Sequence, residues 1–187
     1  MSNTMSWFAR EATTDDMATI QDIYSYYVVN TTTTFEYEVP TVREMEERFN
    51  DIKKKLFPYI VVVDSITEEV YGYAYATTYK VRAAYNNTVE NSIYLRHGLY
   101  RRGLGTFLLQ KLIGRCTMLG LRQMIAVISH GGDTFAGSVA LHKKFGFKHK
   151  GTLTGVGYKF GSWIDSSLYQ LTMGEGSDAQ PTFVLGT

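Results

Sequence analysis

The chain has 187 residues, a formal net charge of +1, an apolar fraction of 44% and a charged fraction of 20%. These values are typical of one globular domain, and they exclude binding to nucleic acid or to an anionic membrane through a strong overall field. Any anion site must therefore be local. The first residues, "MSNTMSWFAR", form no long apolar run, so we expect no signal peptide and no membrane span.

The first half of the chain predicts a strand, two helices and two more strands. These elements are a strand over 7–13, a helix after Asp15 and Asp16, a helix over 41–56, and strands over 58–64 and 70–80. Thr41 with Glu44 three residues later forms a capping-box pattern, which marks the start of the second helix. The polar run "NTTTTFEYEVP" separates the two helices.

The second half alternates strands and helices. The predicted elements are a loop over 81–88, a strand over 90–100, a helix over 103–120, a buried strand over 121–129, a helix over 136–146, and strands over 147–155 and 166–173. Residues 174–187 are small and polar, so we expect one domain over 1–173 and a mobile tail. The order β-α-α-β-β-β-α-β-α-β-β predicts an α/β (α+β) fold with a single mixed sheet.

Cysteine and histidine usage suggests neither disulfides nor a metal. The single cysteine, Cys116, cannot form an internal disulfide, which favours a reducing, cytoplasmic location. The four histidines show no metal-ligand spacing, so we expect no metal site. We interpret three of them, His97, His130 and His149, as structural or surface residues, with His97 inside the central strand.

A basic glycine-containing junction, Arg101-Arg102-Gly103-Leu104-Gly105, joins the strand over 90–100 to the helix that follows. A P-loop is excluded because the chain has no Gly-Lys-Ser/Thr, and a dinucleotide fingerprint is excluded because its third glycine position is Leu108. Free N–H groups at a helix start, together with two arginines, can bind a pyrophosphate. The alternative is a basic turn whose glycines only relieve steric crowding.

Five segments in order carry a resemblance to a known family: "TFEYEVPT", "YKVRAAYNNTVENSIYL", "YRRGLGTFLL", "SVALHKKFGF" and "GYKFGSWIDSSLYQL". Over roughly residues 8 to 173 the chain resembles the GNAT superfamily of acetyl-CoA-dependent N-acetyltransferases. Within it, the chain is similar to the phosphinothricin/methionine-sulfoximine N-acetyltransferases. The resemblance implies a GNAT fold with six to seven strands and about four helices, acetyl-CoA as cosubstrate, no metal, and a homodimer.

The resemblance also implies a path for acetyl-CoA. The pyrophosphate would lie on the turn formed by Arg101, Arg102, Gly103, Leu104, Gly105 and Thr106. The pantetheine and thioester would lie beside Ile93, Tyr94 and Leu95, where the central strand of this fold diverges from the next one. The Leu95 N–H is the expected contact for the oxyanion.

Two positions depart from the family pattern. The signature Gln/Arg-x-x-Gly-x-Gly/Ala begins here with Tyr100, although the backbone amides of the turn are unaffected. The loop "ISHGGDTFAGSVALH" has Phe135 where the family has an asparagine, and it contains an apparent insertion. Asp133 and Ser138 are the expected substitutes for the missing cofactor contacts.

Acetyl transfer to an amine requires a base, a polarised carbonyl, oxyanion stabilisation and a proton for the departing thiolate. The resemblance places the catalytic glutamate at Glu90, whose alternative role is that of an ordinary glutamate at the strand edge. His142 occupies the position of a tyrosine that protonates the thiolate in many members. Its alternative role is that of a helix histidine packed on the sheet.

The acceptor site implied by the resemblance is built from loops. The segment "YKVRAAY" would handle an amino-acid acceptor, with Arg82 binding its carboxylate and with Tyr79, Lys80 and Tyr85 completing the pocket. Phe35 would pack on the aliphatic chain of the acceptor.

Trp163, with Lys159, would lie at a dimer interface or reach into the partner's acceptor pocket. The alternative is a tryptophan packed on its own core.

The expected activity is acetylation of the α-amine of a small amino acid or analogue, in the class of phosphinothricin, methionine sulfoximine and methionine sulfone. Two alternatives remain open. The acceptor is a larger amine, such as a peptide N-terminus, a polyamine or an aminoglycoside, or the chain is a non-catalytic acyl-CoA-binding module.

Overall fold

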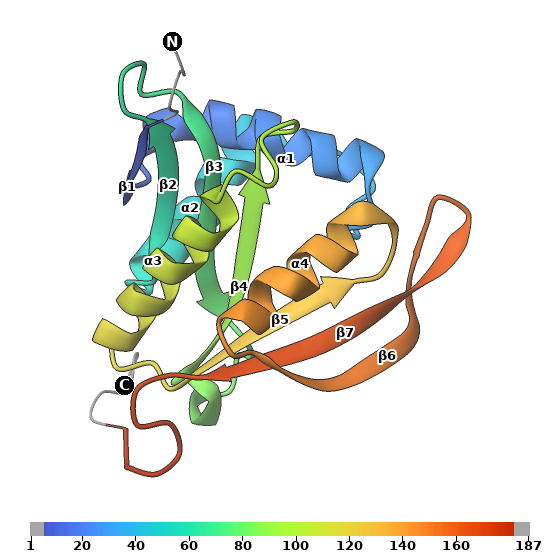
Figure 1. The fold of residues 1–187 in the computed structure, drawn as a ribbon. Coiled ribbons are helices and arrows are strands. Elements are labelled where there is room, and N and C mark those ends of the chain that lie inside the picture. Colours follow the sequence, from blue (N-terminus) through green and yellow to red (C-terminus); the bar gives the residue numbers. More distant parts are fainter. Residues whose placement is uncertain (1–5, 182–187) are drawn as a thin grey trace.

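The structure is a computed structural model that describes residues 6–181, apart from the side chain of Asp133. One seven-stranded sheet is flanked by helices α1 and α2 on one face and by α3 and α4 on the other (Figure 1). The elements are β1 (Trp7–Glu11), α1 (Met17–Asn30), α2 (Val42–Lys54), β2 (Tyr59–Asp64), β3 (Val70–Thr78), β4 (Thr88–Leu95), α3 (Leu104–Met118), β5 (Gln123–Ser129), α4 (Gly132–Lys144), β6 (Lys148–Lys159) and β7 (Ser162–Thr172).

The strand order is β1-β2-β3-β4-β5-β7-β6, and every neighbouring pair is antiparallel except β4 and β5. A parallel pair needs a crossover, which α3 supplies on the front face (Figure 1). The predicted mixed sheet and the predicted order of strands and helices are therefore confirmed.

Capping boxes mark the start of α2 and the start of the 3-10 turn before α1. Thr41 and Glu44 form the predicted one, in which the Glu44 N–H donates to Thr41 Oγ1 at 3.2 Å and Glu44 accepts from the Thr41 N–H at 2.6 Å. A second box, formed by Thr13 and Asp16, opens a short 3-10 turn that leads into α1. These boxes satisfy N–H groups that a helix start leaves without partners.

The core lies on both faces of the central strands. β2 is an almost uninterrupted apolar run, and Val61, Val62 and Val63 are fully buried. Leu108 and Leu112 of α3 cover the front face and are also fully buried. A strand buried on both faces has no alternation of polar and apolar residues, which explains the sequence "YIVVVD".

The predicted boundaries of β4, α4, β6 and β7 were wrong. β4 ends at Leu95, so His97 lies in the following loop, where its ring stacks on Tyr26 at 4.1 Å between centroids. α4 begins at Gly132, so the predicted loop around Phe135 is helical. β6 and β7 extend into one long hairpin, because Phe160 and Gly161, with φ of 50° and 76°, form its two-residue turn.

The mobile tail stays a prediction. In the part that is described, the Arg122 guanidinium donates to the Glu175 carboxylate at 3.1 Å and to the carbonyl of Gln180 at 3.2 Å. Residues 182–187 lie outside the described part. Between residues 6 and 181, no helix is long and apolar enough to cross a lipid bilayer.

Candidate active site

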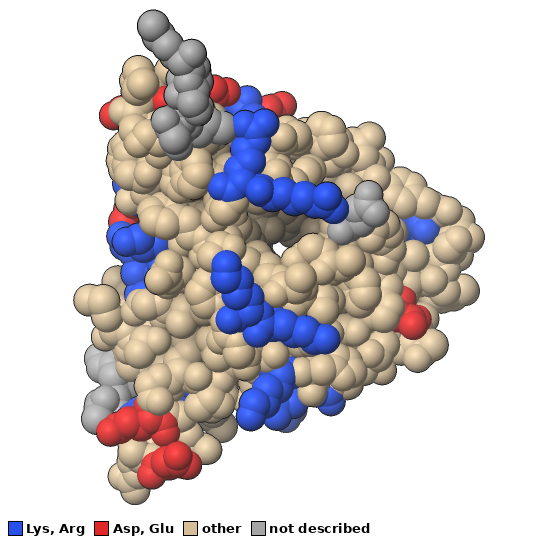
Figure 2. Space-filling model, in the orientation of Figure 1, with Lys and Arg blue, Asp and Glu red and all other residues tan. Residues whose placement is uncertain are grey.

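The central strands β4 and β5 are paired only at their beginnings. Their register runs from Thr88 opposite Gln123 to Glu90 opposite Ile125, and then it stops although β4 continues to Leu95. The two strands therefore diverge beyond Glu90. Figure 2 shows a hollow on the face of the molecule that carries α3 and α4. It lies between the start of α3 and α4, with Lys and Arg side chains on both sides of it. We call this opening the cofactor cleft.

Backbone donors of β4 point into the cofactor cleft. The Arg96 N–H donates to the Tyr71 carbonyl of β3 at 2.8 Å. Because alternate residues of an antiparallel strand point the same way, the N–H groups of Ile93 and Leu95 point away from β3 and toward the β5 side. The divergence of the strands directs them into the cleft.

The Leu95 peptide groups already have a partner. The Tyr27 hydroxyl, from α1, donates to the Leu95 carbonyl at 2.6 Å and accepts from the Leu95 N–H at 3.2 Å. The oxyanion contact of Leu95 thus stays a prediction, and it requires the Tyr27 hydroxyl to move. Ile93 lies two residues closer to Glu90 and directs a second N–H into the cleft.

A backbone cradle follows β4. Arg101 and Gly103 have left-handed backbones, with φ of 61° and 87°, and Gly103 is the N-cap of α3. The helix start thus presents its free N–H groups beside two exposed arginines, Arg101 and Arg102. A Cβ on Gly105 would lie 3.3 Å from Leu141 Cδ2 and 3.7 Å from Leu95 Cδ1. Helix α3 therefore packs closely on β4 and α4 at Gly105. The pyrophosphate contacts of this turn, including that of Thr106, stay predictions.

Tyr100, which departs from the family signature, has a structural partner. Its hydroxyl lies 3.2 Å from the Tyr27 hydroxyl. Since the Tyr27 proton is directed to the Leu95 carbonyl, Tyr100 donates and Tyr27 accepts. Tyr100 therefore connects the cradle to the β4 backbone at the mouth of the cleft. Tyr27 itself was not predicted, and a tyrosine at helical spacing in a chain with 14 tyrosines gives no signal of this role.

Glu90 lies on the opposite face of β4 from the neighbouring Asn91, at the point where β4 and β5 separate. The side chain is half-buried, and burial raises the pKa of the carboxyl above its ordinary value. Among the described residues, it has no hydrogen bond or ion pair. An unpaired, partly desolvated carboxylate is a suitable proton acceptor near neutral pH.

His142 is 4% exposed and faces Asn91 across the front of the sheet. Its Nδ1 lies 2.8 Å from the Ser138 carbonyl, so Nδ1 carries the proton and Nε2 accepts from the Asn91 amide at 3.0 Å. Burial lowers the pKa of the ring and favours this neutral form. In this state His142 has no proton to give a thiolate, which favours the packed helix histidine over the general acid.

The two substitutes expected for the altered loop lie in α4. Ser138 holds His142 through its carbonyl, and its Oγ lies 3.4 Å from His142 Nδ1. Asp133 is in the first turn of α4, but its side chain lies outside what the structure describes. Their roles toward the cofactor stay predictions. With the same exception of Asp133, no group of three or more metal-ligating side chains occurs between residues 6 and 181.

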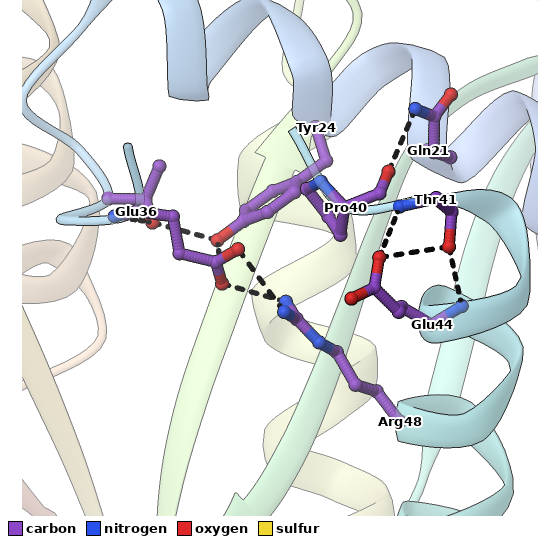
Figure 3. A network of polar contacts seen from close by, with 8 residues as sticks. Gln21, Tyr24, Glu36, Pro40, Thr41, Glu44 and Arg48 are labelled. Carbon is purple, nitrogen blue, oxygen red and sulfur yellow. Dashed lines mark hydrogen bonds and ion pairs between the residues drawn. The ribbon is translucent and has the colours of Figure 1, made fainter. Parts of the chain in front are cut away.

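A polar network lies behind the sheet, where the loop after α1 approaches α2 (Figure 3). The Glu36 carboxylate accepts from the Tyr24 hydroxyl at 2.9 Å and from both terminal nitrogens of Arg48, at 2.7 and 3.2 Å. Burial, followed by Glu90 and Glu36 among other groups, raises the pKa of Tyr75. Tyr75 pairs with Ser92 across β3 and β4, so it lies on the same face of the sheet as Glu90.

The other predicted acceptor segment lies where β4 begins. Tyr79 and Tyr85 form an edge-to-face pair with centroids 5.9 Å apart, and the Lys80 ammonium lies 5.2 and 5.1 Å from their rings. These three residues thus form one cluster beside the start of β4. Arg82, the N-cap of the short 3-10 turn over Ala83–Tyr85, is exposed.

Trp163 and Lys159 were predicted to act together, but they have different environments in the β6–β7 hairpin. Trp163 is 70% exposed and contacts Tyr158 edge to face, so it is not packed on its own core. Lys159 is 2% exposed and binds the carbonyls of Thr31 and Thr34, both at 2.8 Å. The prediction that Lys159 reaches a partner subunit was wrong, because its ammonium is enclosed within its own chain.

A mixed sheet that opens beside a backbone anion cradle, with an unpaired glutamate at the vertex, defines an acyl-CoA-dependent transferase site. The chain belongs to the GNAT family of acetyltransferases, since the family described as "Acetyltransferase (GNAT) domain" matches residues 9–168. The recognised resemblance and the enzyme class are thereby confirmed.

Individual proteins similar to this chain are also acetyltransferases. The chain is 38% identical to the phosphinothricin N-acetyltransferase of Alcaligenes faecalis, over 89% of this chain and 83% of that protein. It is 34% identical to an L-methionine sulfoximine/L-methionine sulfone acetyltransferase of Pseudomonas aeruginosa, over 90% and 96%. A crystal structure of a Sinorhizobium meliloti phosphinothricin acetyltransferase in complex with AcCoA is similar with a TM-score of 0.90 and 40% identity, over 97% and 96% of the chains.

Proposed function

We propose that this protein transfers the acetyl group of acetyl-CoA directly to the α-amine of a small amino acid or analogue, with cosubstrate and amine bound together. Phosphinothricin, methionine sulfoximine and methionine sulfone are the acceptor class. The observation that carries the proposal is the unpaired, partly buried Glu90 at the vertex of the cofactor cleft. The names of relatives at 34–38% identity support the acceptor class.

Different residues of this chain bind the cosubstrate, accept the proton and stabilise the oxyanion. Glu90 takes the proton that the ammonium of the acceptor must lose before its nitrogen can attack. The N–H of Ile93, with that of Leu95 once Tyr27 moves, stabilises negative charge on the acetyl oxygen. The cradle from Arg101 to Thr106 holds the pyrophosphate. Acetyl-CoA supplies the activated thioester, whose sulfur leaves as the C–S bond breaks and takes a proton from solvent, and no metal is invoked.

A larger amine is the alternative acceptor, and a non-catalytic acyl-CoA-binding module is the alternative class. The departures from the family pattern at Tyr100 and in the loop over 129–137 would favour the non-catalytic module. The hydrogen bond of Tyr100 to Tyr27 leaves the backbone of the cradle in place. Release of free thiol from acetyl-CoA, measured against a panel of small amino-acid analogues, a polyamine, a peptide and an aminoglycoside, separates the three. Thiol release with the polyamine, the peptide or the aminoglycoside alone would reject the acceptor class. No thiol release with any amine would favour the non-catalytic module.

Arg82→Ala is expected to raise the KM for carboxylate-bearing amines about tenfold to a hundredfold, because a guanidinium–carboxylate pair contributes about 1.5–3 kcal/mol. The KM for acetyl-CoA should not change. Arg43→Ala is a matched control, since Arg43 is exposed on α2 and, among residues 6–181, pairs only with Glu47 in the same helix. An unchanged amine KM in the Arg82 variant would remove Arg82 from the site and favour a cationic acceptor.

We further propose a cytoplasmic homodimer in which the hairpin tip is part of the interface. Tyr158, Phe160 and Trp163 are 47%, 59% and 70% exposed on this tip, and large exposed aromatics are typical of interface centres. Trp163→Ser is expected to weaken the dimer by about tenfold or more in sedimentation equilibrium. An unchanged assembly, or a monomeric wild type, would contradict the proposal.

A further inference from the structure

The loop between α1 and α2 is held by residues from distant parts of the chain. We define residues 31–36 as the acceptor loop, because it carries Phe35. Thr32 Oγ1 donates to the His130 carbonyl at the end of β5, at 2.8 Å. Thr33 Oγ1 donates to Thr134 Oγ1 of α4 at 3.2 Å. The run of threonines therefore ties the loop to the half of the molecule across the cofactor cleft.

The strongest of these attachments is Lys159. Its ammonium donates to the Thr31 and Thr34 carbonyls at 2.8 Å each, from both ends of one short stretch of the loop. The residue is 2% exposed, and no other lysine of the described chain is buried. Burial lowers the pKa of the ammonium, although Glu36 partly opposes this effect. A buried ammonium is costly, so its two carbonyl partners account for its presence.

The same strand also positions the Phe35 ring. A Cβ added to Gly157 would lie 2.4 Å from the Phe35 ring, which means that the ring packs directly on the Gly157 backbone. Gly157 and Lys159 are two residues apart in β6 and so share one face of the strand. One strand thus fixes the backbone of the loop through Lys159 and its aromatic side chain through Gly157.

We propose that Lys159 is a positioning residue for the amine acceptor site, which fixes the acceptor loop so that Phe35 and Glu36 face the reacting amine. This inference rests on the proposed function. A loop without regular backbone pairing loses entropy when it is ordered, and a loop fixed in advance does not incur that loss when the substrate binds. Lys159 contacts Thr31 and Thr34, while the cradle lies at the start of α3, so the effect should be confined to the acceptor.

Lys159→Met tests this directly, because it keeps the length of the side chain and removes both hydrogen bonds. The KM for a turned-over amine, such as methionine sulfone, is expected to rise about tenfold to a hundredfold. The KM and Kd for acetyl-CoA should remain unchanged. Lys150→Met is the matched control, since Lys150 is an exposed lysine of the same strand. Equal shifts in the amine and acetyl-CoA constants, or no shift in either, would overturn the proposal.

Gly157→Ala provides a second route if Lys159→Met does not fold. It leaves the ammonium in place and displaces the Phe35 ring, so the amine KM should again rise while acetyl-CoA binding is retained. A folded Gly157→Ala variant with the wild-type amine KM would also count against the proposal.

Hydrogen exchange provides a readout that needs no substrate. Backbone amides of residues 31–36 are expected to exchange at least tenfold faster in Lys159→Met than in the wild type or in Lys150→Met. If the wild type acetylates no small amine but this acceleration is seen, the proposed function fails, and only the ordering of residues 31–36 by Lys159 is supported. Unchanged exchange with an active wild type would refute the positioning role alone.

Discussion

Glu90→Gln is expected to lower kcat by about 100- to 10,000-fold, the range that a positioned general base contributes. Glutamine keeps the size and polarity of the side chain but cannot accept the ammonium proton. The Kd for acetyl-CoA should stay at the wild-type value, because Glu90 lies on the opposite face of β4 from Asn91, Leu95 and the cradle. Stopped-flow thiol release and calorimetric titration with acetyl-CoA measure the two quantities.

The pH profile distinguishes a base from a structural glutamate. Only the carboxylate can accept the proton, so kcat/KM of the wild type should fall as the pH drops through the pKa of Glu90, which burial raises above 4.5. The residual activity of Glu90→Gln should lack this acidic limb. A limb that persists unchanged in the variant would assign it to another group.

As the pH rises through the pKa of Glu90, the stability of the wild type should fall while its activity rises. When the pKa of a carboxyl is higher in the folded than in the unfolded state, its contribution to the free energy of unfolding is fully present only below the unfolded pKa. That contribution is lost as the pH rises through the folded pKa. Glu90→Gln should therefore equal the wild type in acid and be at least as stable at neutral pH, by chemical denaturation. A large loss of stability at neutral pH would indicate a structural role for the carboxylate.

Gly105→Val is expected to weaken acetyl-CoA binding about tenfold to a hundredfold, the equivalent of 1–3 kcal/mol of overpacking. The new Cβ would already lie 3.3 Å from Leu141, and the valine methyl groups would fill the space between α3, β4 and α4. Calorimetric titration with acetyl-CoA measures the change. The amine KM, extrapolated to saturating acetyl-CoA, should be affected much less.

Gly114→Val is the matched control for this change. Gly114 lies in the same helix, and no atom of residues 6–181 outside that stretch of helix lies within 4 Å of a Cβ placed there. Both variants replace a helical glycine, so propensity effects cancel in the comparison. If the two variants bind acetyl-CoA equally well, the cradle does not lie at Gly105.

The fold followed from local signals to a large extent. Capping at Thr41, the uninterrupted apolar run of β2 and the amphipathic pattern of α3 each depend on neighbours within one or two turns, and each was confirmed. The prediction continued the strand through Arg96, His97 and Gly98 to Tyr100, but β4 ends at Leu95. The strand ends where the chain turns, since Gly98 has a φ of 83° and the Leu99 N–H donates to the Arg96 carbonyl at 3.1 Å.

The candidate site was less accessible from the sequence, because its contacts join distant segments. Glu90 and the cradle could be located by resemblance and by spacing. The bond between Tyr27 and Leu95 spans 68 residues, and that between Asn91 and His142 spans 51. Lys159 illustrates the limit most clearly, since a lysine in a hairpin is ordinarily exposed, and only the packing of β6 on the acceptor loop makes it internal.

Product stoichiometry tests the central claim most directly. The wild-type protein is incubated with acetyl-CoA and methionine sulfone as the only amine, and free thiol and N-acetylated amino acid are quantified together by absorbance and mass spectrometry. Direct transfer with Glu90 as base predicts equal amounts of the two products, and almost none of either with Glu90→Gln. Thiol release without acetylated amine, or equal turnover by the variant, would contradict the account.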